Sequence, residues 1–245
     1  MGRSCDIVVP VLNEADSIDE FVARVDALGL ADALLFVDNG STDGTLERLA
    51  ARGARVLRHD ANLGYGASVR DGIAAGDGET IVIIDADLEY PPEAIPRLLA
   101  ALDAEPVVYC SRFLGAAPPP MPAFRLLGNR LLSSLANALY GQRTTDLYTG
   151  MKGLRRSALP LAALRRDGFE HGAEIAALIA FSGHRIAEIG IDYTPRQRGA
   201  SKMRHIPETA KLLAYLVWYW LRGTFTRWPN RKPPQRNTEG HRGPL

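Results

Sequence analysis

The sequence predicts an α/β fold with a mostly parallel, doubly wound central sheet. Short apolar segments alternate with segments of helical periodicity through the first half of the 245-residue chain, which is typical of successive βαβ units. The composition, with 46% hydrophobic and 23% charged residues, is that of a globular chain able to bury a substantial core. The most informative segment is the β-branched run 81–84, which predicts a buried strand and leads into Asp85 and Asp87.

The first half of the chain divides into alternating predicted strands and helices. Ser41 or Thr42 is expected to cap the second helix, with Asp43 in its first turn near the positive end of the helix dipole. Pro91 and Pro92 are expected to open the fourth helix, because proline is tolerated in a first turn. The predicted strands are 7–11, 34–37, 55–57, 81–84 and 107–110, and the other predicted helices are 15–28 and 64–75.

The second half of the chain lacks this regular alternation. A segment rich in Pro, Ala and Gly predicts a loop at 115–122. The tail after Trp228 has no periodicity and is predicted to be disordered. The remaining segments are predicted as a helix at 126–139, turns at 146–153, a helix at 169–181, a strand or hairpin at 184–193 and a polar, basic loop at 195–204.

The charge distribution argues against nucleic acid as a partner. The formal net charge is +1, so no strong basic field surrounds the whole molecule. Basic residues gather from Lys202 onward, which favours either an anionic surface as a partner or a solvated tail. The two cysteines, Cys5 and Cys110, are expected to be core residues, and nothing in the sequence predicts a disulfide framework.

One apolar segment near the C-terminus bears on membrane contact. No segment reaches the roughly 20 apolar residues that a membrane-spanning helix needs. The nearest candidate, 212–221, contains Trp and Tyr and is flanked by Lys211 and Arg222, which suits a helix lying in a membrane interface. Packing on the domain or on a second subunit is the equal alternative. Because no apolar signal segment precedes the first strand, the expected location is the cytoplasm.

The loops after the predicted strands are expected to meet at one edge of the sheet, because crossovers between parallel strands are right-handed. Ligands of open α/β sheets bind at this edge. Asp85 and Asp87 would repel each other and lose solvation there unless a cation lay between them. A divalent metal that also holds a phosphate-bearing ligand would supply that cation. Gly64 and Gly66, at a helix N-terminus, suit a phosphate site, although plain turns are the commoner use of such glycines.

Four motifs in sequence order resemble those of the family 2 glycosyltransferases, which have the GT-A fold, a Rossmann-like sheet flanked by helices. These motifs are 9–14, 37–45, 62–66 and 85–87, and the likeness extends to about Met203. Within that family, polyprenyl-phosphate glycosyltransferases of the dolichyl-phosphate mannose synthase type are the most similar. The segments that carry this second likeness are 85–92, 111–113, 149–153 and 198–203.

The resemblance implies an inverting, metal-dependent transfer from a nucleotide sugar to dolichyl or undecaprenyl phosphate. The donor would be of the GDP-mannose or UDP-glucose type. Asp38 would contact the edge of the base, and Arg198 and Lys202 would close a basic loop over the diphosphate. The residues implied in nucleotide-sugar binding are Pro10, Asn13, Glu14, Asp38, Asn62, Gly66, Asp85, Ala86, Asp87, Arg198 and Lys202.

The resemblance also implies a metal site of oxygen ligands. Asp87 would be its catalytic ligand, helped by Asp85 and Glu89. The best-known type member has Gln at the position of Glu89, so this chain adds a negative charge beside the metal. Mg²⁺ and Mn²⁺ both suit such ligands, and either is expected.

The acceptor decides which further residues the reaction needs. A lipid phosphate is already ionised at neutral pH, so it would need cations rather than a general base. Arg112 and Arg130 are the implied cations, with Ser134 one helical turn after Arg130. Arg125 is the alternative to Arg130, because the preceding loop differs in length. An alcohol acceptor, such as a natural-product sugar, would instead need a base, for which the candidates are Glu170, Glu174 and Asp146.

The chain is therefore expected to have three parts. A GT-A domain over 1–204 would bind the nucleotide sugar through 1–113 and the acceptor through 114–204. An amphipathic helix over 205–226 would contact the cytoplasmic face of the membrane, and a disordered basic tail would occupy 227–245. A catalytically silent module that only binds the nucleotide sugar is the remaining alternative.

Overall fold

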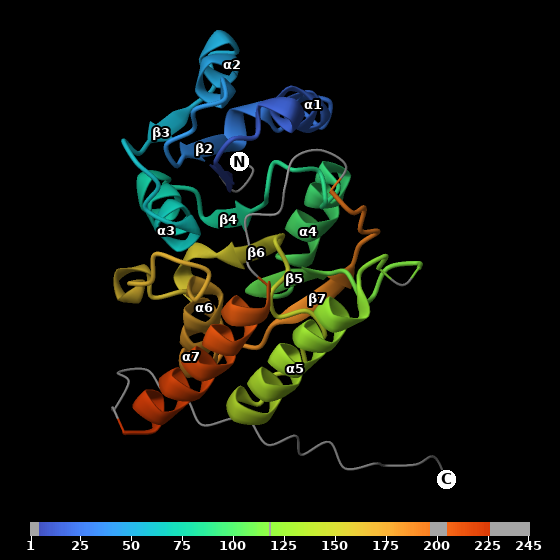
Figure 1. The fold of residues 1–245 in the computed structure, drawn as a ribbon, viewed down its shortest axis with the longest axis vertical. Coiled ribbons are helices and arrows are strands. Elements are labelled where there is room, and N and C mark those ends of the chain that lie inside the picture. The colour runs from blue at the N-terminus through green and yellow to red at the C-terminus, as the bar shows by residue number, and fades with distance from the viewer. Residues whose placement is uncertain (1–4, 118, 197–204, 226–245) are drawn as a thin grey trace.

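The computed structural model describes residues 5–117, 119–196 and 205–225, and within them seven strands form one mixed sheet. The sheet order is β3-β2-β1-β4-β6-β5-β7 (Figure 1). The strands are β1 Cys5–Val11, β2 Leu34–Asp38, β3 Val56–Arg58, β4 Thr80–Ile83, β5 Val107–Ser111, β6 Lys152–Arg155 and β7 Ala187–Gly190. The α-helices are α1 Ala15–Asp26, α2 Thr45–Ala51, α3 Tyr65–Ala75, α4 Ile95–Ala101, α5 Ala123–Tyr140, α6 His171–Phe181 and α7 His205–Phe225.

The predicted mostly parallel α/β sheet is confirmed, with one strand that the sequence analysis missed. Strand β6 runs antiparallel to both β4 and β5, whereas β1, β2, β3 and β4 pair in parallel. The segment 146–153 was predicted as turns, and its last two residues, Lys152 and Gly153, continue no apolar run. The strand forms because it pairs on both edges, and Gly153 leaves room for the side chains of Leu98 and Leu102.

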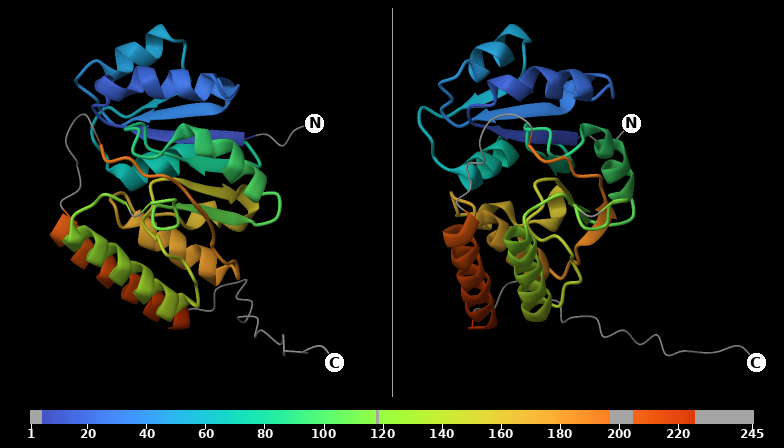
Figure 2. Two further views of the ribbon diagram at one scale, coloured as in Figure 1. Left: turned by 90° about the vertical axis from the view of Figure 1, so that its right-hand side faces the viewer. Right: turned by 45° about the vertical axis from the view of Figure 1, so that its right-hand side comes forward.

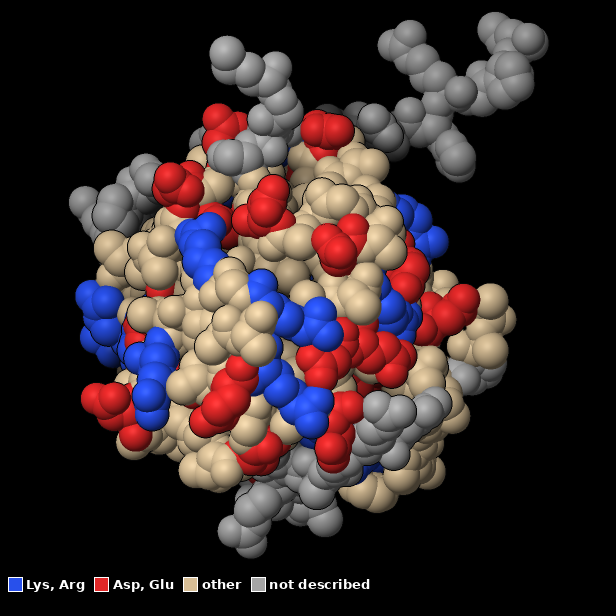
Figure 3. Space-filling view, turned by 90° about the horizontal axis from the view of Figure 1, so that it is seen from above, with Lys and Arg blue, Asp and Glu red and all other residues tan. Residues whose placement is uncertain are grey.

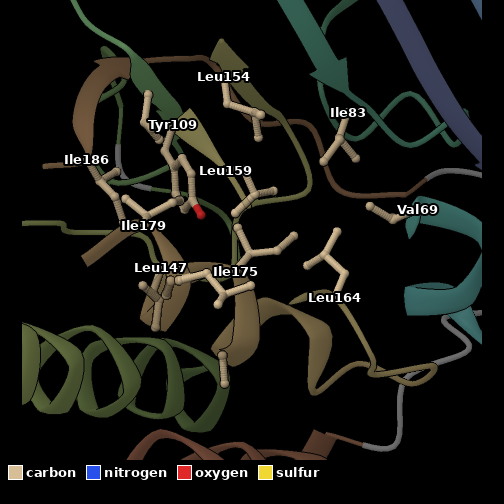
Figure 4. Packing of buried hydrophobic residues seen from close by; sticks show 14 of the residues in the cluster. Val69, Ile83, Tyr109, Leu147, Leu154, Leu159, Leu164, Ile175, Ile179 and Ile186 are labelled. Atoms are coloured by element: carbon tan, nitrogen blue, oxygen red, sulfur yellow. The ribbon is translucent and has the colours of Figure 1, made fainter. Parts of the chain in front are cut away.

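Two hydrophobic cores lie on opposite faces of this sheet. On β1, Ile7 faces one core and Val8 the other, as the period of a strand requires. Helices α1, α2 and α4 cover the first core, and α3, α5, α6 and α7 cover the second (Figures 1 and 2). In the second core, Tyr109 and Leu154 of the sheet lie opposite Ile175 of α6 (Figure 4).

Helices α5 and α7 lie side by side at the end of the molecule that is remote from α1 and α2 (Figure 2). The Tyr140 hydroxyl donates to the carbonyl of Leu216 at 2.6 Å. Leu212 and Leu216 are fully buried, whereas Trp218 is partly exposed. The predicted C-terminal helix is confirmed, and one face of it packs on the domain.

Several predicted boundaries were wrong. The expected capping by Ser41 or Thr42 does not occur, because α2 begins at Thr45. Asp43 does lie at its start, where its Oδ1 accepts from the backbone N of Thr45 at 3.0 Å. A 3₁₀ turn, Pro92–Ala94, precedes α4. The other helices differ from their predictions by a few residues at their ends, where periodicity is least informative.

The predicted division at residue 113 passes through the sheet. Strands β6 and β7, from the second half, pair with β4 and β5 of the first half. The predicted tail 227–245 lies outside the described residues. On the α1–α2 side of the molecule, positive and negative side chains are interspersed (Figure 3), as in the ion pairs of Asp19 with Arg48 and Arg52.

Candidate active site

A cavity of about 660 Å³ opens at the carboxyl ends of β1 and β4 and extends to α5 and α7. This is the sheet edge at which ligands of α/β proteins bind. The sequence analysis correctly placed a cleft here, because the loops after these strands converge. The predicted site residues that line it are Pro10, Glu14, Asn62, Asp85, Ala86, Asp87, Glu89 and Arg112.

The acid pair after β4 forms one wall of the cavity. Burial raises the pKa of Asp85. Burial, and then the nearby charges of Asp85 and Glu89, raise the pKa of Asp87. Leu88 adopts a left-handed φ of 63°, and the backbone N of Glu89 donates to Asp87 Oδ1 at 3.0 Å, so the turn that carries Asp87 and Glu89 is tight. Raised pKa values mean that the ionised acids lack sufficient positive charge around them.

The carboxylates fit a divalent metal by this electrostatic criterion and by their oxygen chemistry. Across residues 5–117, 119–196 and 205–225, however, no group of three or more His, Cys, Asp or Glu side chains is preassembled around a common point. Asp85, Asp87 and Glu89 all line the cavity and are the carboxylates at this wall that could hold a metal.

Tyr65, which the sequence analysis did not single out, holds Asp85. Its hydroxyl donates to Asp85 Oδ1 at 2.6 Å. Its ring stacks on Phe169 at 5.7 Å and contacts His171 at 5.0 Å. Gly150 lies on the other side, where a Cβ atom would be 2.5 Å from Asp85 Oδ2. The orientation of Asp85 is therefore fixed from both sides.

Arg196 is the second residue that the sequence analysis missed. Its guanidinium pairs with Glu14 and lies 4.0 Å from Asp87 Oδ2. Its backbone N donates to Glu89 Oε1 at 3.3 Å. The basic loop 195–204 was predicted, but Arg198 and Lys202 were chosen from it, and both lie outside the described residues. Arg196 supplies a cation to the acidic wall.

The predicted nucleoside side of the site is partly assembled. Asp38 is fully buried and is not among the residues that line the cavity. Its Oδ1 accepts from Ser41 N at 3.2 Å, and its Oδ2 has no partner within the part of the chain that is described. Asn39 donates from Nδ2 to Asn62 Oδ1 at 2.9 Å, and both line the cavity. Asn13 instead lies outside the lining, where its side chain accepts from the backbone N of Thr42 at 2.8 Å.

Gly66 does not line the large cavity either. A Cβ atom there would collide with the backbone oxygens of Arg166 and Gly168. The glycine is needed so that the start of α3 can pack against the segment before α6, which is a structural role rather than direct ligand contact. The phosphate-site interpretation of Gly66 is therefore not supported by its position.

Only some of the predicted acceptor residues line the cavity in the structure. Arg112 lines the cavity, but its guanidinium forms a bidentate pair with Asp146, with Nε and Nη2 at 2.8 and 2.7 Å from the carboxylate oxygens. Arg130 and Ser134 lie on the exposed face of α5 and do not reach the cavity. Arg125, five residues before Arg130, lines it instead. Of the two arginines that the sequence left open, Arg125 is therefore the one that lies at the cavity.

The candidate bases also lie away from the cavity. Glu174 is buried and accepts from the backbone N of Arg165 and Arg166 at 3.0 Å and from the Tyr219 hydroxyl at 2.8 Å. Glu170 pairs with Lys211 at 2.8 Å. Neither residue lines the large cavity. Both carboxylates therefore serve local structure in this arrangement.

The residues that match a known family extend over most of the sheet. The profile described as Glycosyl transferase family 2 matches residues 6–160. The chain belongs to glycosyltransferase family 2. Its family membership makes it a glycosyltransferase, and the family predicted from the ordered motifs is confirmed.

Two relatives illustrate the range of similar sequences in the family. A dolichyl-phosphate hexose transferase of Haloferax volcanii is 32% identical over 192 residues, which cover 78% of this chain and 82% of the relative. An undecaprenyl-phosphate 4-deoxy-4-formamido-L-arabinose transferase of Edwardsiella ictaluri is 32% identical over 207 residues, which cover 80% of this chain and 62% of the relative.

A solved structure confirms the predicted GT-A fold. Glucosyl-3-phosphoglycerate synthase from Mycobacterium tuberculosis, in complex with Mn²⁺, UDP-glucose and phosphoglyceric acid, superposes with a TM-score of 0.66. The sequences are 22% identical, and the match covers 89% of this chain and 80% of that one. At this identity the likeness establishes the fold.

Proposed function

We propose that this family 2 glycosyltransferase transfers a sugar from a nucleotide sugar to a polyprenyl phosphate, with inversion at the sugar carbon. One observation carries the proposal: the same cavity has buried acids on one wall and an opening along α5 and α7 that is flanked by exposed apolar side chains. Relatives named as dolichyl- and undecaprenyl-phosphate transferases support this acceptor class.

On the donor side, Asp85, Asp87 and Glu89 would hold Mg²⁺ or Mn²⁺. The metal, when bound, supplies positive charge to the departing diphosphate. Arg196 adds a second cation at this wall, and Arg198 and Lys202 are proposed to join it. The buried carboxylate of Asp38, with Pro10, Glu14 and Asn62, would bind the nucleoside. The neighbour that was crystallised with Mn²⁺ and UDP-glucose supports this donor class.

Tyr65→Phe tests how strongly the acid wall depends on its orientation. The variant keeps the ring that packs on Phe169 and removes only the donor to Asp85. Because a hydrogen bond to a charged group contributes about 1.5–3 kcal/mol, we expect about tenfold weaker Mn²⁺-dependent donor binding. Calorimetric titration of Mn²⁺ with UDP-glucose or GDP-mannose measures it. Unchanged affinity for both donors would mean that Tyr65 does not orient Asp85.

On the acceptor side, Arg125 is the cation best placed for a phosphate. It lines the cavity from the first turns of α5, and its Nε is buried without a hydrogen-bond partner among the described residues. A phosphate monoester is ionised at neutral pH, so its oxygen can attack the sugar carbon without a general base. Arg125 would hold that oxygen, while Arg112 keeps its partner Asp146.

The end of the cavity that lies along α5 and α7 suits a lipid chain. Phe124 of α5 lines the cavity and is 54% exposed, and Leu127 and Leu131 continue the same apolar face at helical spacing. Trp218 and Leu221 of α7 add exposed apolar surface. No helix in the described part of the chain has the length and hydropathy to cross a membrane. We propose that this face contacts the membrane surface from which the acceptor is taken.

The alcohol-acceptor alternative makes a distinct prediction at Glu174. Glu174→Gln is expected to lower the melting temperature, because a buried acceptor of two backbone N–H groups is weakened, at a cost of about 1–3 kcal/mol. Turnover of the folded variant should stay within about threefold, a barrier change below about 1 kcal/mol. Loss of nearly all turnover with an unchanged melting temperature would instead identify Glu174 as a general base.

The proposed function is tested with purified protein and undecaprenyl phosphate. A panel of UDP- and GDP-sugars, each with Mg²⁺ or Mn²⁺, should include at least one donor that yields a lipid-extractable sugar. Asp87→Ala is the matched negative control. Transfer to soluble alcohols alone, or no lipid-linked product from any donor, would overturn the lipid-phosphate acceptor.

A further inference from the structure

The missed strand β6 places a lysine inside the cavity. Lys152 is 4% exposed and lines the cavity from the middle of the sheet. Its Nζ lies 5.5 Å from the centre of the Tyr109 ring, and among the described residues no oxygen accepts a hydrogen bond from it. A buried ammonium is costly unless partners satisfy it, so its position in a ligand cavity needs an explanation.

Helix α6 contributes a second buried polar group, one nitrogen of which lacks a hydrogen-bond partner within the described ranges. His171 is 5% exposed and also lines the cavity. Its Nδ1 lies 3.2 Å from the carbonyl oxygen of Gly168, so Nδ1 carries the proton and donates it. Nε2 is then a hydrogen-bond acceptor, and it is buried with no partner in the described chain. Burial, followed by the charge of Lys152, lowers the pKa of His171 to about 3, so the ring stays neutral.

The two groups form a pair of opposite hydrogen-bonding character beside the acid wall. Lys152 only donates, and His171 Nε2 only accepts. Tyr65 connects His171 to Asp85, because its ring contacts His171 and its hydroxyl binds Asp85. An ionised phosphate oxygen only accepts hydrogen bonds. It would accept one from Lys152, but it would be repelled by the lone pair on His171 Nε2. A hydroxyl group both donates and accepts, and therefore satisfies both.

We propose that Lys152 and His171 form a subsite for one hydroxyl group of the transferred sugar, which rests on the proposed nucleotide-sugar donor. The hydroxyl oxygen accepts from Lys152 Nζ, and its proton is donated to His171 Nε2. Lys152 and His171 line the same cavity as Asp85, where a sugar joined to a metal-bound diphosphate would be expected. The subsite gives the enzyme a means of selecting sugars by the presence and orientation of that hydroxyl.

The test separates the sugar from the nucleotide. UDP, UDP-glucose, GDP and GDP-mannose are titrated with Mn²⁺ into the full chain and into three variants. His171→Gln places an amide near the position of Nε2, whereas His171→Asn places one near Nδ1 only. Lys152→Met removes the charge at similar length. Tyr109→Phe is the control, because it deletes an equally buried hydroxyl that has no hydrogen-bond partner in the described structure.

His171→Asn and Lys152→Met should bind the nucleotide diphosphate as the wild type does and lose about ten- to fiftyfold in affinity for the nucleotide sugar. His171→Gln should recover most of that loss, and the control should match the wild type. If His171→Asn and Lys152→Met lost affinity equally for the nucleotide diphosphate and the nucleotide sugar, or lost affinity for neither, the subsite would be overturned. The donor proposal would remain intact. Failure of all four nucleotides to bind the wild type would overturn the donor proposal itself. If Lys152→Met does not fold, the two His171 variants still decide the result.

Discussion

Asp87→Ala should reduce sugar transfer by about three orders of magnitude, the scale of removing a group that stabilises charge developing at the reacting centre. The melting temperature of the same variant should be unchanged or higher. Both effects follow from the position of Asp87, a buried carboxylate beside Asp85 and Glu89. The variant lacks a proposed metal ligand, which lowers transfer. It also lacks one of three carboxylates whose charges repel in the absence of a metal, which spares the melting temperature. Transfer assays and thermal unfolding in EDTA measure the two quantities.

The pH dependence of stability gives an independent check on Asp87. Its pKa is raised to about 7 in the folded chain from a usual value of 3.8, so between these values the folded state binds more protons than the unfolded state. The contribution of Asp87 to the free energy of unfolding therefore falls as the pH rises from about 4 to about 7. In EDTA, the advantage of Asp87→Ala over the wild type should grow across this range and then level off.

Adding Mn²⁺ should reverse the order of the two proteins. The metal is expected to raise the melting temperature of the wild type and to have little effect on the variant, because stabilisation follows binding to the folded state. Asp87→Asn, which keeps the shape of the side chain, is the matched control for packing. Strong destabilisation of either variant with retained transfer would contradict the assignment of Asp87 to the metal.

Arg112→Met should have the largest effect on stability. It leaves Asp146, which is fully buried, without the guanidinium that binds both of its oxygens. Breaking one side of a buried pair costs about 3–5 kcal/mol, which corresponds to a melting temperature lower by an amount on the order of 10 °C for a chain of this size. Thermal unfolding of the purified variant measures the loss.

A double variant separates the structural and catalytic roles of Arg112. Arg112→Met combined with Asp146→Asn removes the uncompensated charge and should recover a large part of the lost stability. If Arg112 also holds the acceptor, transfer in this folded double variant stays low. Recovery of both stability and transfer would restrict Arg112 to the structural pair, and no recovery of stability would show that the pair is not what the single variant breaks.

The fold could be predicted largely because its first half repeats one local pattern. The apolar run 81–84 and the helical spacing in 15–28 are dictated by burial on one or both faces, which leaves a clear sequence signal. Strand β6 could not be predicted in the same way. Its stability comes from antiparallel pairing with β4 and β5, which are distant in sequence, and its own residues carry no strand periodicity.

The same reason explains which site residues were predicted. Asp85 and Asp87 follow a recognisable strand, so their position at the cavity could be inferred. Lys152 entered the cavity with the missed strand, and no ligand spacing in the sequence singles out His171, which also lines the cavity. The sequence could not decide between Arg125 and Arg130, because a loop of unknown length precedes α5. In the structure Arg125 lines the cavity, and Arg130 and Ser134 do not.

The position of β6 has a consequence for how this protein is made and recombined. During synthesis, the adjacent edges of β4 and β5 have no partner between them until residues 152–155 leave the ribosome. Edges of β4 and β5 therefore stay unpaired until β6 has been made, and unpaired strand edges favour aggregation. The same geometry affects chimeras of two relatives joined at residue 113. Strand β6 of one relative would have to pair with both β4 and β5 of the other. Donor specificity is therefore better exchanged by substitutions inside the cavity than by swapping halves.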